Sequence, residues 1–192
     1  MRMPTGSHAV AAERIERPVA VFLCATLFYA IFYFVNDTLI ESLDAVPGAY
    51  LFRLSSGVKL LLVLLIGWVG SAAIAAFCFC WCALVLFPGN VVLAAEVALS
   101  AGVIPLLACQ VIQHRLLPDL SRLRWQQLFA AAVVFATLNS VTRESILYLH
   151  LHNGDLVENV MRTFFSDLLG IFTALYAFRF LLLRLGPPMN HK

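Results

Sequence analysis

The chain of 192 residues is 61% hydrophobic and only 12% charged, and its mean hydropathy is +0.88. A soluble domain usually carries about twice that charged fraction, so this composition excludes an ordinary water-soluble protein and predicts one helical domain embedded in a membrane. The formal net charge of +2 is too small, and the basic residues are too scattered, for a nucleic-acid binder, so we expect no nucleic-acid partner.

The first apolar run, residues 18–35, follows Arg14 and Arg17 and is long enough for one membrane span. A signal peptide also begins with basic residues, but this run is longer than such a segment and lacks a small-residue cleavage site. We therefore expect a cytoplasmic N-terminal segment over 1–17 and a retained transmembrane helix after it. The next stretch, 36–57, mixes acids with turn formers and is predicted to be a loop with some short helix.

Residues 60–95 contain no charged side chain. One straight helix of that length would measure about 54 Å, whereas the hydrocarbon core of a bilayer is about 30 Å thick. The run must therefore break, and the strongest turn signals lie at 67–70 (Gly-Trp-Val-Gly) and 88–90 (Pro-Gly-Asn). These breaks define helices two, three and four. Helix two is short, so helices two and three either cross the membrane as they stand or form a re-entrant hairpin buried in protein.

The second half of the chain predicts two more helices. Residues 110–127 combine basic residues with leucines at helical spacing, which is typical of an amphipathic loop at the membrane interface. Helix five is expected over 128–149 and helix six over 156–185, with a short polar turn at 150–155 between them.

The distribution of positive charge orients these six helices. With the N-terminus inside, the basic residues of both termini and of the 110–127 loop lie on the cytoplasmic side, as the positive-inside rule requires. A five-helix chain would put that loop and the C-terminus on opposite sides. We therefore expect an all-α bundle of six transmembrane helices over 18–185, surrounded by the lipid of a bacterial cytoplasmic (inner) membrane, and a cytoplasmic tail over 186–192.

Ionisable side chains at bilayer depth are informative, because burying one without a partner costs about 3 kcal/mol or more. If helices five and six are antiparallel around their turn, Glu144 lies level with Arg162 as an ion pair, and Asn139 lies level with Asp167. Small residues at spacing four predict that the two helices pack closely. These stripes are Ala132, Ala136 and Ser140 on helix five, and Ser166, Gly170 and Ala174 on helix six.

These side chains suggest a ligand site. We expect an outward-opening pocket lined by Glu96, Asn139, Arg143, Glu144, Arg162 and Asp167. Arg143 has no evident partner, since its sequence neighbour does not share its helix face, and it should either bind an anionic ligand or extend to the outer interface. The alternative is that the polar pairs simply lock two helices together.

The remaining reactive side chains do not form a pattern typical of catalysis or metal binding. In the Cys-Phe-Cys-Trp-Cys run only Cys78 and Cys82 share a helix face, and no His or acidic residue lies near them, so we expect neither a metal nor a cofactor. The two histidines of the 150–155 turn are expected to be solvated. Hydrolase motifs and phosphate-cradling glycine loops are missing from the sequence, so we expect no enzymatic activity.

Two stretches carry a resemblance to a known family. Residues 54–70 read LSSGVKLLLVLLIGWVG and residues 165–170 read FSDLLG. Residues 54–70 resemble the Pro-Ser-Gly start, the leucine-rich short helix and the Gly-Trp turn of the bacterial membrane-associated sensor domains found ahead of diguanylate cyclases and histidine kinases. Residues 165–170 resemble the Gly-Asp-x-x-Gly element of the same domains. Ser55 and Ser166 depart from the Pro and Gly of those domains. The resemblance implies a sensory domain, and the polar side chains described above suggest that its ligand is small and anionic or polar.

Two other functions remain open. The sequence ends shortly after helix six, so a sensor of this kind would signal through a separate partner protein. In architecture alone the chain is similar to the six-helix substrate-binding components of energy-coupling-factor transporters, which makes a small transport subunit the alternative. The third possibility is a structural partner in a membrane complex.

Overall fold

The structure, a computed structural model, describes residues 7–43, 53–115, 125–152 and 154–185. These residues are helical throughout apart from short turns, and no β-strand occurs among them. The helices are α1 (Ser7–Leu43), α2 (Leu54–Ile66), α3 (Trp68–Trp81) with the π-helical turn η2 (Cys82–Leu86) at its end, α4 (Val91–Arg115), α5 (Trp125–Leu151) and α6 (Leu156–Leu185).

The two breaks predicted in the long apolar run are confirmed. Gly67 alone separates α2 from α3, and its φ of 60° lies in the left-handed region that glycine tolerates best. The turn before α4 contains Gly89, with φ of 90°, and the side chain of Asn90 accepts a hydrogen bond from the Leu93 N–H at 3.1 Å. This side-chain cap satisfies an N–H group that has no partner within the helix.

The other helix boundaries agree with the prediction in part. Helix α6 begins and ends where it was predicted, and the Asp155 carboxylate caps it by accepting the Val157 N–H at 2.8 Å. The expected loop over 36–57 is wrong at both ends, because 36–43 continue α1 and 54–57 begin α2. The expected interfacial loop over 110–127 is likewise wrong at both ends, where α4 continues and α5 begins. The middles of both loops, 44–52 and 116–124, lie outside the described residues.

Four helical segments of the described chain are long and apolar enough to cross a membrane, namely Arg17–Thr38, Trp68–Leu86, Val91–Val111 and Leu156–Phe178. The chain is therefore an all-helical, membrane-embedded protein. At about 20 Å, α2 is too short for a hydrocarbon core of about 30 Å. Helix α5 is long enough, but the polar and charged residues of its second half keep it out of this group.

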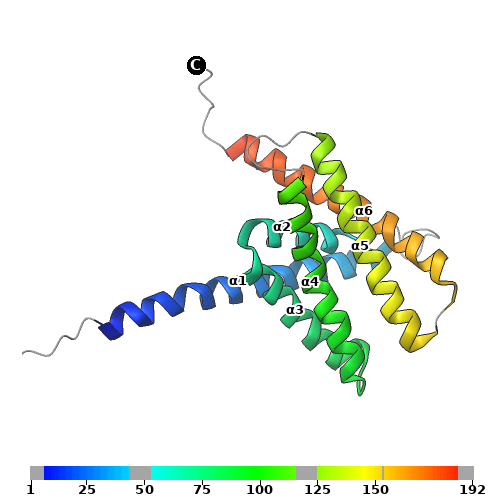
Figure 1. Cartoon of the computed structure of the whole chain (residues 1–192), viewed down its shortest axis with the longest axis horizontal. Coiled ribbons are helices and arrows are strands. Elements are labelled where there is room, and N and C mark those ends of the chain that lie inside the picture. The colour runs from blue at the N-terminus through cyan, green and yellow to red at the C-terminus, as the bar shows by residue number, and fades with distance from the viewer. Residues whose placement is uncertain (1–6, 44–52, 116–124, 153, 186–192) are drawn as a thin grey trace, which may run out of the picture.

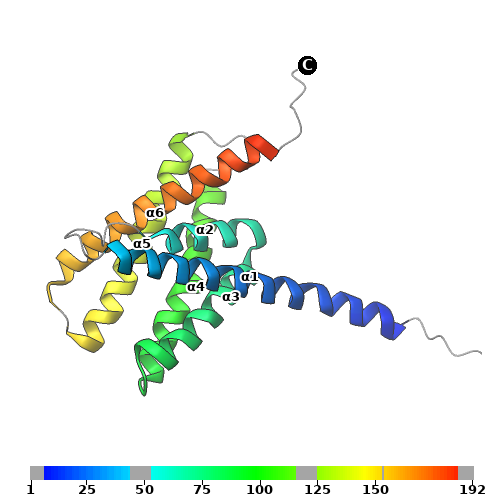
Figure 2. The same ribbon diagram turned by 180° about the vertical axis from the view of Figure 1, so that it is seen from behind.

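Helix α2 lies at the centre of the helical assembly. It contacts α6, α3, α1 and α4, while α3, α4, α5 and α6 pack one after another in antiparallel pairs (Figure 1). The N-terminal half of α1 projects away from the other helices, as both views show (Figure 2). The short α2 is thus enclosed by the longer helices.

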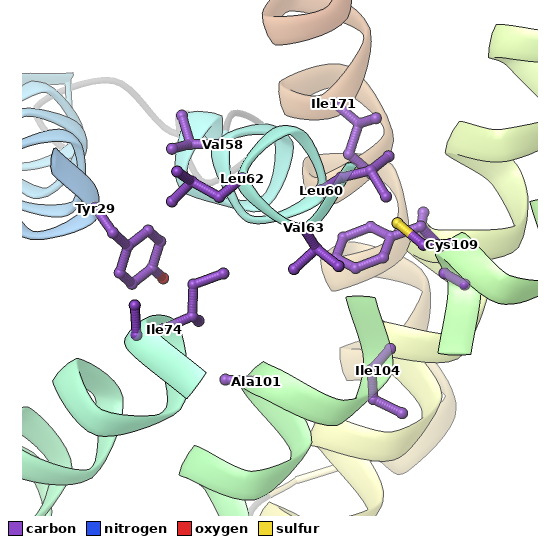
Figure 3. Close-up of a cluster of buried hydrophobic side chains, with 14 of the residues drawn as sticks. Tyr29, Val58, Leu60, Leu62, Val63, Ile74, Ala101, Ile104, Cys109 and Ile171 are labelled. Atoms are coloured by element: carbon purple, nitrogen blue, oxygen red, sulfur yellow. The ribbon is translucent and has the colours of Figure 1, made fainter. Parts of the chain in front are cut away.

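The apolar core forms around α2. Its buried side chain Leu60 lies beside Ile171 of α6, and Tyr29 of α1 and Ile74 of α3 lie on the other side of the helix (Figure 3). Leu60, Ile74 and Tyr29 are fully shielded from solvent and lipid. Because lipid tails are as apolar as these side chains, close packing rather than the hydrophobic effect holds such helices together in a bilayer.

Small residues let α2 and α6 approach closely. A Cβ atom on Gly170 would overlap the carbonyl oxygen of Arg53, and one on Gly57 would overlap the side chain of Ala174. We expected the stripe of Ser166, Gly170 and Ala174 to pack against α5, and for its two last members this is corrected, because they lie against α2. This side of α6 is therefore covered by α2, which is distant in the sequence and too short to span the membrane.

Candidate functional site

A fully buried carboxylate joins three helices. Asp167 of α6 is 0% exposed, and its two carboxylate oxygens accept hydrogen bonds of 2.6 Å each, one from Ser56 Oγ of α2 and one from Asn139 Nδ2 of α5. We call these three residues the polar junction. The predicted contact between Asn139 and Asp167 is confirmed. Asp167 lies about 17 Å along α6 from its first residue, which is near the middle of a hydrocarbon core of about 30 Å.

Backbone contacts fix the start of α2 at this junction. The side-chain oxygen of Asn36 in α1 accepts the Leu54 N–H at 2.7 Å and so caps α2. The Arg53 N–H donates to the carbonyl oxygen of Ser166 in α6 at 3.3 Å. Helices α1 and α6 therefore both hold the end of α2 that carries Ser56.

Glu144 of α5 has partners other than the predicted one. Its Oε1 atom accepts a hydrogen bond from Thr163 Oγ1 at 2.8 Å and lies 3.3 Å from Arg143 Nη1. The predicted ion pair with Arg162 is wrong, because Arg162 is exposed and pairs with Glu158 at 3.0 Å. Neighbouring residues on a helix point about 100° apart, so only one of positions 162 and 163 can face α5. The expectation that Arg143 has no partner on its own helix is also wrong.

Glu96 takes part in a separate contact at the end of the helices. Its Oε2 atom lies 2.8 Å from His150 Nε2, and this exposed pair joins the second turn of α4 to the last turn of α5. The structure thus brings together Asn139 with Asp167 and Arg143 with Glu144. No described contact joins Glu96 or Arg162 to either pair, so the six predicted residues do not form one site.

Two half-buried cations next to the polar junction were missed. Arg53 directly precedes α2 and Lys59 lies in its second turn. Arg53 is attracted by Asp167 and Glu144 and repelled by Arg143, whereas Lys59 is attracted by Asp167 and repelled by both arginines. Neither cationic side chain forms an ion pair with another described residue. We call Arg53, Lys59 and Arg143 the cationic cluster.

One sequence signal could have found this cluster. Lys59 is the only charged residue in the thirteen residues of α2, and an isolated lysine in an apolar membrane helix usually faces the interior of the bundle. Arg53 carried no such signal, since it follows the acidic and turn-forming stretch. Only the fold, which places α2 across α6, shows that both cations lie beside Asp167.

Aromatic side chains of α1 and α3 line the other side of the cluster. The Lys59 ammonium lies 6.0 Å from the centre of the Tyr29 ring, at the outer limit of a cation–π contact. Tyr33 packs edge-on against Trp81 with ring centres 5.8 Å apart, and its hydroxyl group interacts with Asp37 and Arg143. The Trp81 Nε1–H group is enclosed and makes no hydrogen bond of acceptable geometry, although it lies near the Tyr33 hydroxyl.

The cysteines lie near these aromatic residues but do not form a ligand set. Cys78 and Cys82 are buried on the same face while Cys80 is exposed, as the helical spacing predicted. Cys78 Sγ lies 4.0 Å from the Tyr29 hydroxyl. Across the described residues, no group of three or more His, Cys, Asp or Glu side chains is arranged to hold a metal ion.

Comparisons of the chain with protein-family models, with curated proteins and with solved structures found no match. Its function is therefore inferred from the chemistry of the polar junction and the cationic cluster.

Proposed function

We propose that this chain is a non-enzymatic membrane domain that binds a small polar ligand and acts in sensing. Arg53 and Lys59 carry this proposal, because both are half-buried among apolar helices and neither has an ion-pair partner among the described residues. A charged side chain at the centre of a membrane helix costs about 3 kcal/mol on insertion scales. Such a cost without an internal partner is typical of a position that meets a ligand.

The proposed membrane arrangement has six segments, with both termini on the cytoplasmic side of a bacterial inner membrane. Helix α5 crosses the membrane despite its polar residues, since Asn139 and Glu144 are buried against α6 rather than exposed to lipid. The short α2 returns the chain towards the cytoplasm within the protein, where its neighbours rather than lipid surround it.

A sensory role is favoured by where the family-like stretches lie. The stretch 54–70 contributes Ser56 and Lys59, and the stretch 165–170 contributes Asp167, so the two stretches that resemble sensor domains meet at the polar junction. A ligand bound there would contact α2 and α6 together. The signal would pass to a separate partner protein.

A structural role is the second candidate, and one observation favours it. Both oxygens of Asp167 and one oxygen of Glu144 already have partners within the protein, as expected of contacts that only lock helices together. Arg53 and Lys59 do not fit this role, because they add buried charge without adding a contact.

A ligand screen on the purified full chain tests the proposal. The protein is placed in phosphatidylcholine nanodiscs, and its thermal unfolding is followed with neutral, cationic and anionic metabolites. We expect at least one class to raise the midpoint, because a ligand that binds only the folded state stabilises it. No shift with any class would favour the structural role. Uptake of the bound compound into liposomes would instead show a transport subunit.

A further inference from the structure

We propose that the cationic cluster is an anion-binding site that takes one carboxylate or phosphate group between α2 and α5. This inference rests on the proposed function, because it names the chemical class of the ligand at the same site. Arg53 and Lys59 lie at the start of α2 and Arg143 lies in α5, and each interacts electrostatically with the other two or with their shared acidic neighbours.

Among the residues whose side chains the structure describes, the balance of charge around the cluster is positive. Asp167 and Glu144 are the described carboxylates that attract its cations most strongly, so three positive groups share two negative ones there. Asp37 is exposed and interacts with Tyr33. Asp167 is moreover occupied by Ser56 and Asn139, which leaves it less able to neutralise Lys59. One added negative group would balance the cluster.

Several hydrogen-bond donors lie in or beside the cluster. The Lys59 ammonium and the Arg53 guanidinium are donors only. The Tyr29 hydroxyl, which lies 4.0 Å from Cys78 Sγ, has a proton that it can donate. The enclosed Trp81 N–H lies near the Tyr33 hydroxyl but makes no hydrogen bond of acceptable geometry. An enclosed donor without an acceptor costs about 1–3 kcal/mol. A ligand with several acceptor oxygens would satisfy these groups, whereas a cation or an apolar molecule would not.

Replacing Lys59 tests the site directly. Lys59→Met keeps the length and the apolar stem of the side chain but removes its charge. Arg162→Met is the matched control, because it removes a cation that is exposed and pairs only with its own helix. Both variants and the unaltered chain are studied in phosphatidylcholine nanodiscs with acetate, succinate, citrate and inorganic phosphate, each at about 10 mM, which would saturate a site with a Kd of about 1 mM.

We expect at least one of these anions to raise the unfolding midpoint of the unaltered chain and of Arg162→Met above that in potassium chloride of equal ionic strength. For Lys59→Met the affinity should be weaker on the order of tenfold or more, since a hydrogen bond between two charged groups is lost. Without an anion, Lys59→Met should be at least as stable as the unaltered chain. A response of Lys59→Met equal to that of the control, or its destabilisation without ligand, overturns the proposal.

A second measurement does not depend on the folding of that variant. With Trp68 and Trp125 changed to Phe, Trp81 is the only tryptophan of the chain, and the anion should shift its fluorescence emission. Phosphatidylglycerol nanodiscs separate two sources of the anion: stabilisation there alone, lost in Lys59→Met, assigns the site to a lipid headgroup. No shift with any anion or with this lipid overturns the proposal, whereas the proposed function survives if a neutral or cationic compound binds.

Discussion

At the residue scale, Asp167 and Lys59 are two charged side chains inside the bundle that differ in the partners the protein provides for them. The carboxylate of Asp167 is fully enclosed and has two short hydrogen bonds from other helices, so its burial is compensated within the fold. The ammonium of Lys59 lies over the Tyr29 ring at 6.0 Å and is attracted by Cys78 and by the carboxylate of Asp167, which already has two hydrogen bonds. The first residue joins helices, and the second is the residue on which the proposed anion site depends.

Removing one partner of Asp167 should destabilise the fold. Asn139→Ala leaves an oxygen of the buried carboxylate without its donor, which should cost about 1–3 kcal/mol or more. Thermal unfolding of the purified chain in nanodiscs measures this loss. Glu158→Gln breaks the exposed pair with Arg162 and should change stability by less than about 1 kcal/mol. Equal midpoints for the two variants would argue against a stabilising role of the junction.

At the scale of the elements, α2 depends on its neighbours. A helix of thirteen residues is marginal in isolation, and this one is held by a cap from Asn36 of α1 and by close contact of Gly57 with α6. Gly67 connects it to α3 through a single residue. The position of the cationic cluster is therefore set by the packing between α2 and α6.

Adding one methyl group to that packing should displace α2. Gly170→Ala places a Cβ atom against the carbonyl oxygen of Arg53, which belongs to the backbone and cannot rotate away. We expect a loss of about 1–3 kcal/mol from this overpacking, measured as a lower unfolding midpoint. Leu169→Ala changes the adjacent, exposed position and should have a much smaller effect. If Gly170→Ala were as stable as Leu169→Ala, the close approach of the two helices would be refuted.

At the scale of the whole molecule, the number of crossings depends on α5. Four apolar segments qualify as spans by length and composition, whereas α5 carries Asn139 and Glu144 on the side that it turns to α6. Its hydropathy is low because these residues are polar, but its exposed surface includes apolar side chains such as Phe129 and Val141. A polar face directed inward is compatible with crossing.

Epitope tags in two turns decide this point. If α4 and α5 both cross, a tag after Gly89 and a tag after Gly154 lie on the same, outer face, and tags at the termini lie on the cytoplasmic face. Antibody or protease access in intact spheroplasts and in inverted vesicles measures the side of each tag. If α5 does not cross, the two turn tags are found on opposite faces.

The sequence predicted features that depend on neighbours in the chain, and it missed those that depend on tertiary contacts. The glycine breaks and the level pairing of Asn139 with Asp167 follow from local turns and from one short hairpin. Glu144 contacts Thr163 and not Arg162 because of how α6 is rotated about its own axis. Counting residues from the turn predicts which residues lie at the same level, but it does not predict this rotation. The role of Lys59 depends on α2 lying across a helix about a hundred residues further along the chain.

That distance has a consequence for synthesis. The hydrogen bond between Ser56 and Asp167 joins residues 111 positions apart, so α2 leaves the ribosome long before the helix that covers its small-residue face. Until α6 is inserted, Arg53, Ser56 and Lys59 lack the carboxylate of Asp167 beside them. Helix α6, which is made long after α2, therefore completes the centre of the protein. A nascent chain interrupted before α6 would expose the charged start of α2 without its partners to quality control.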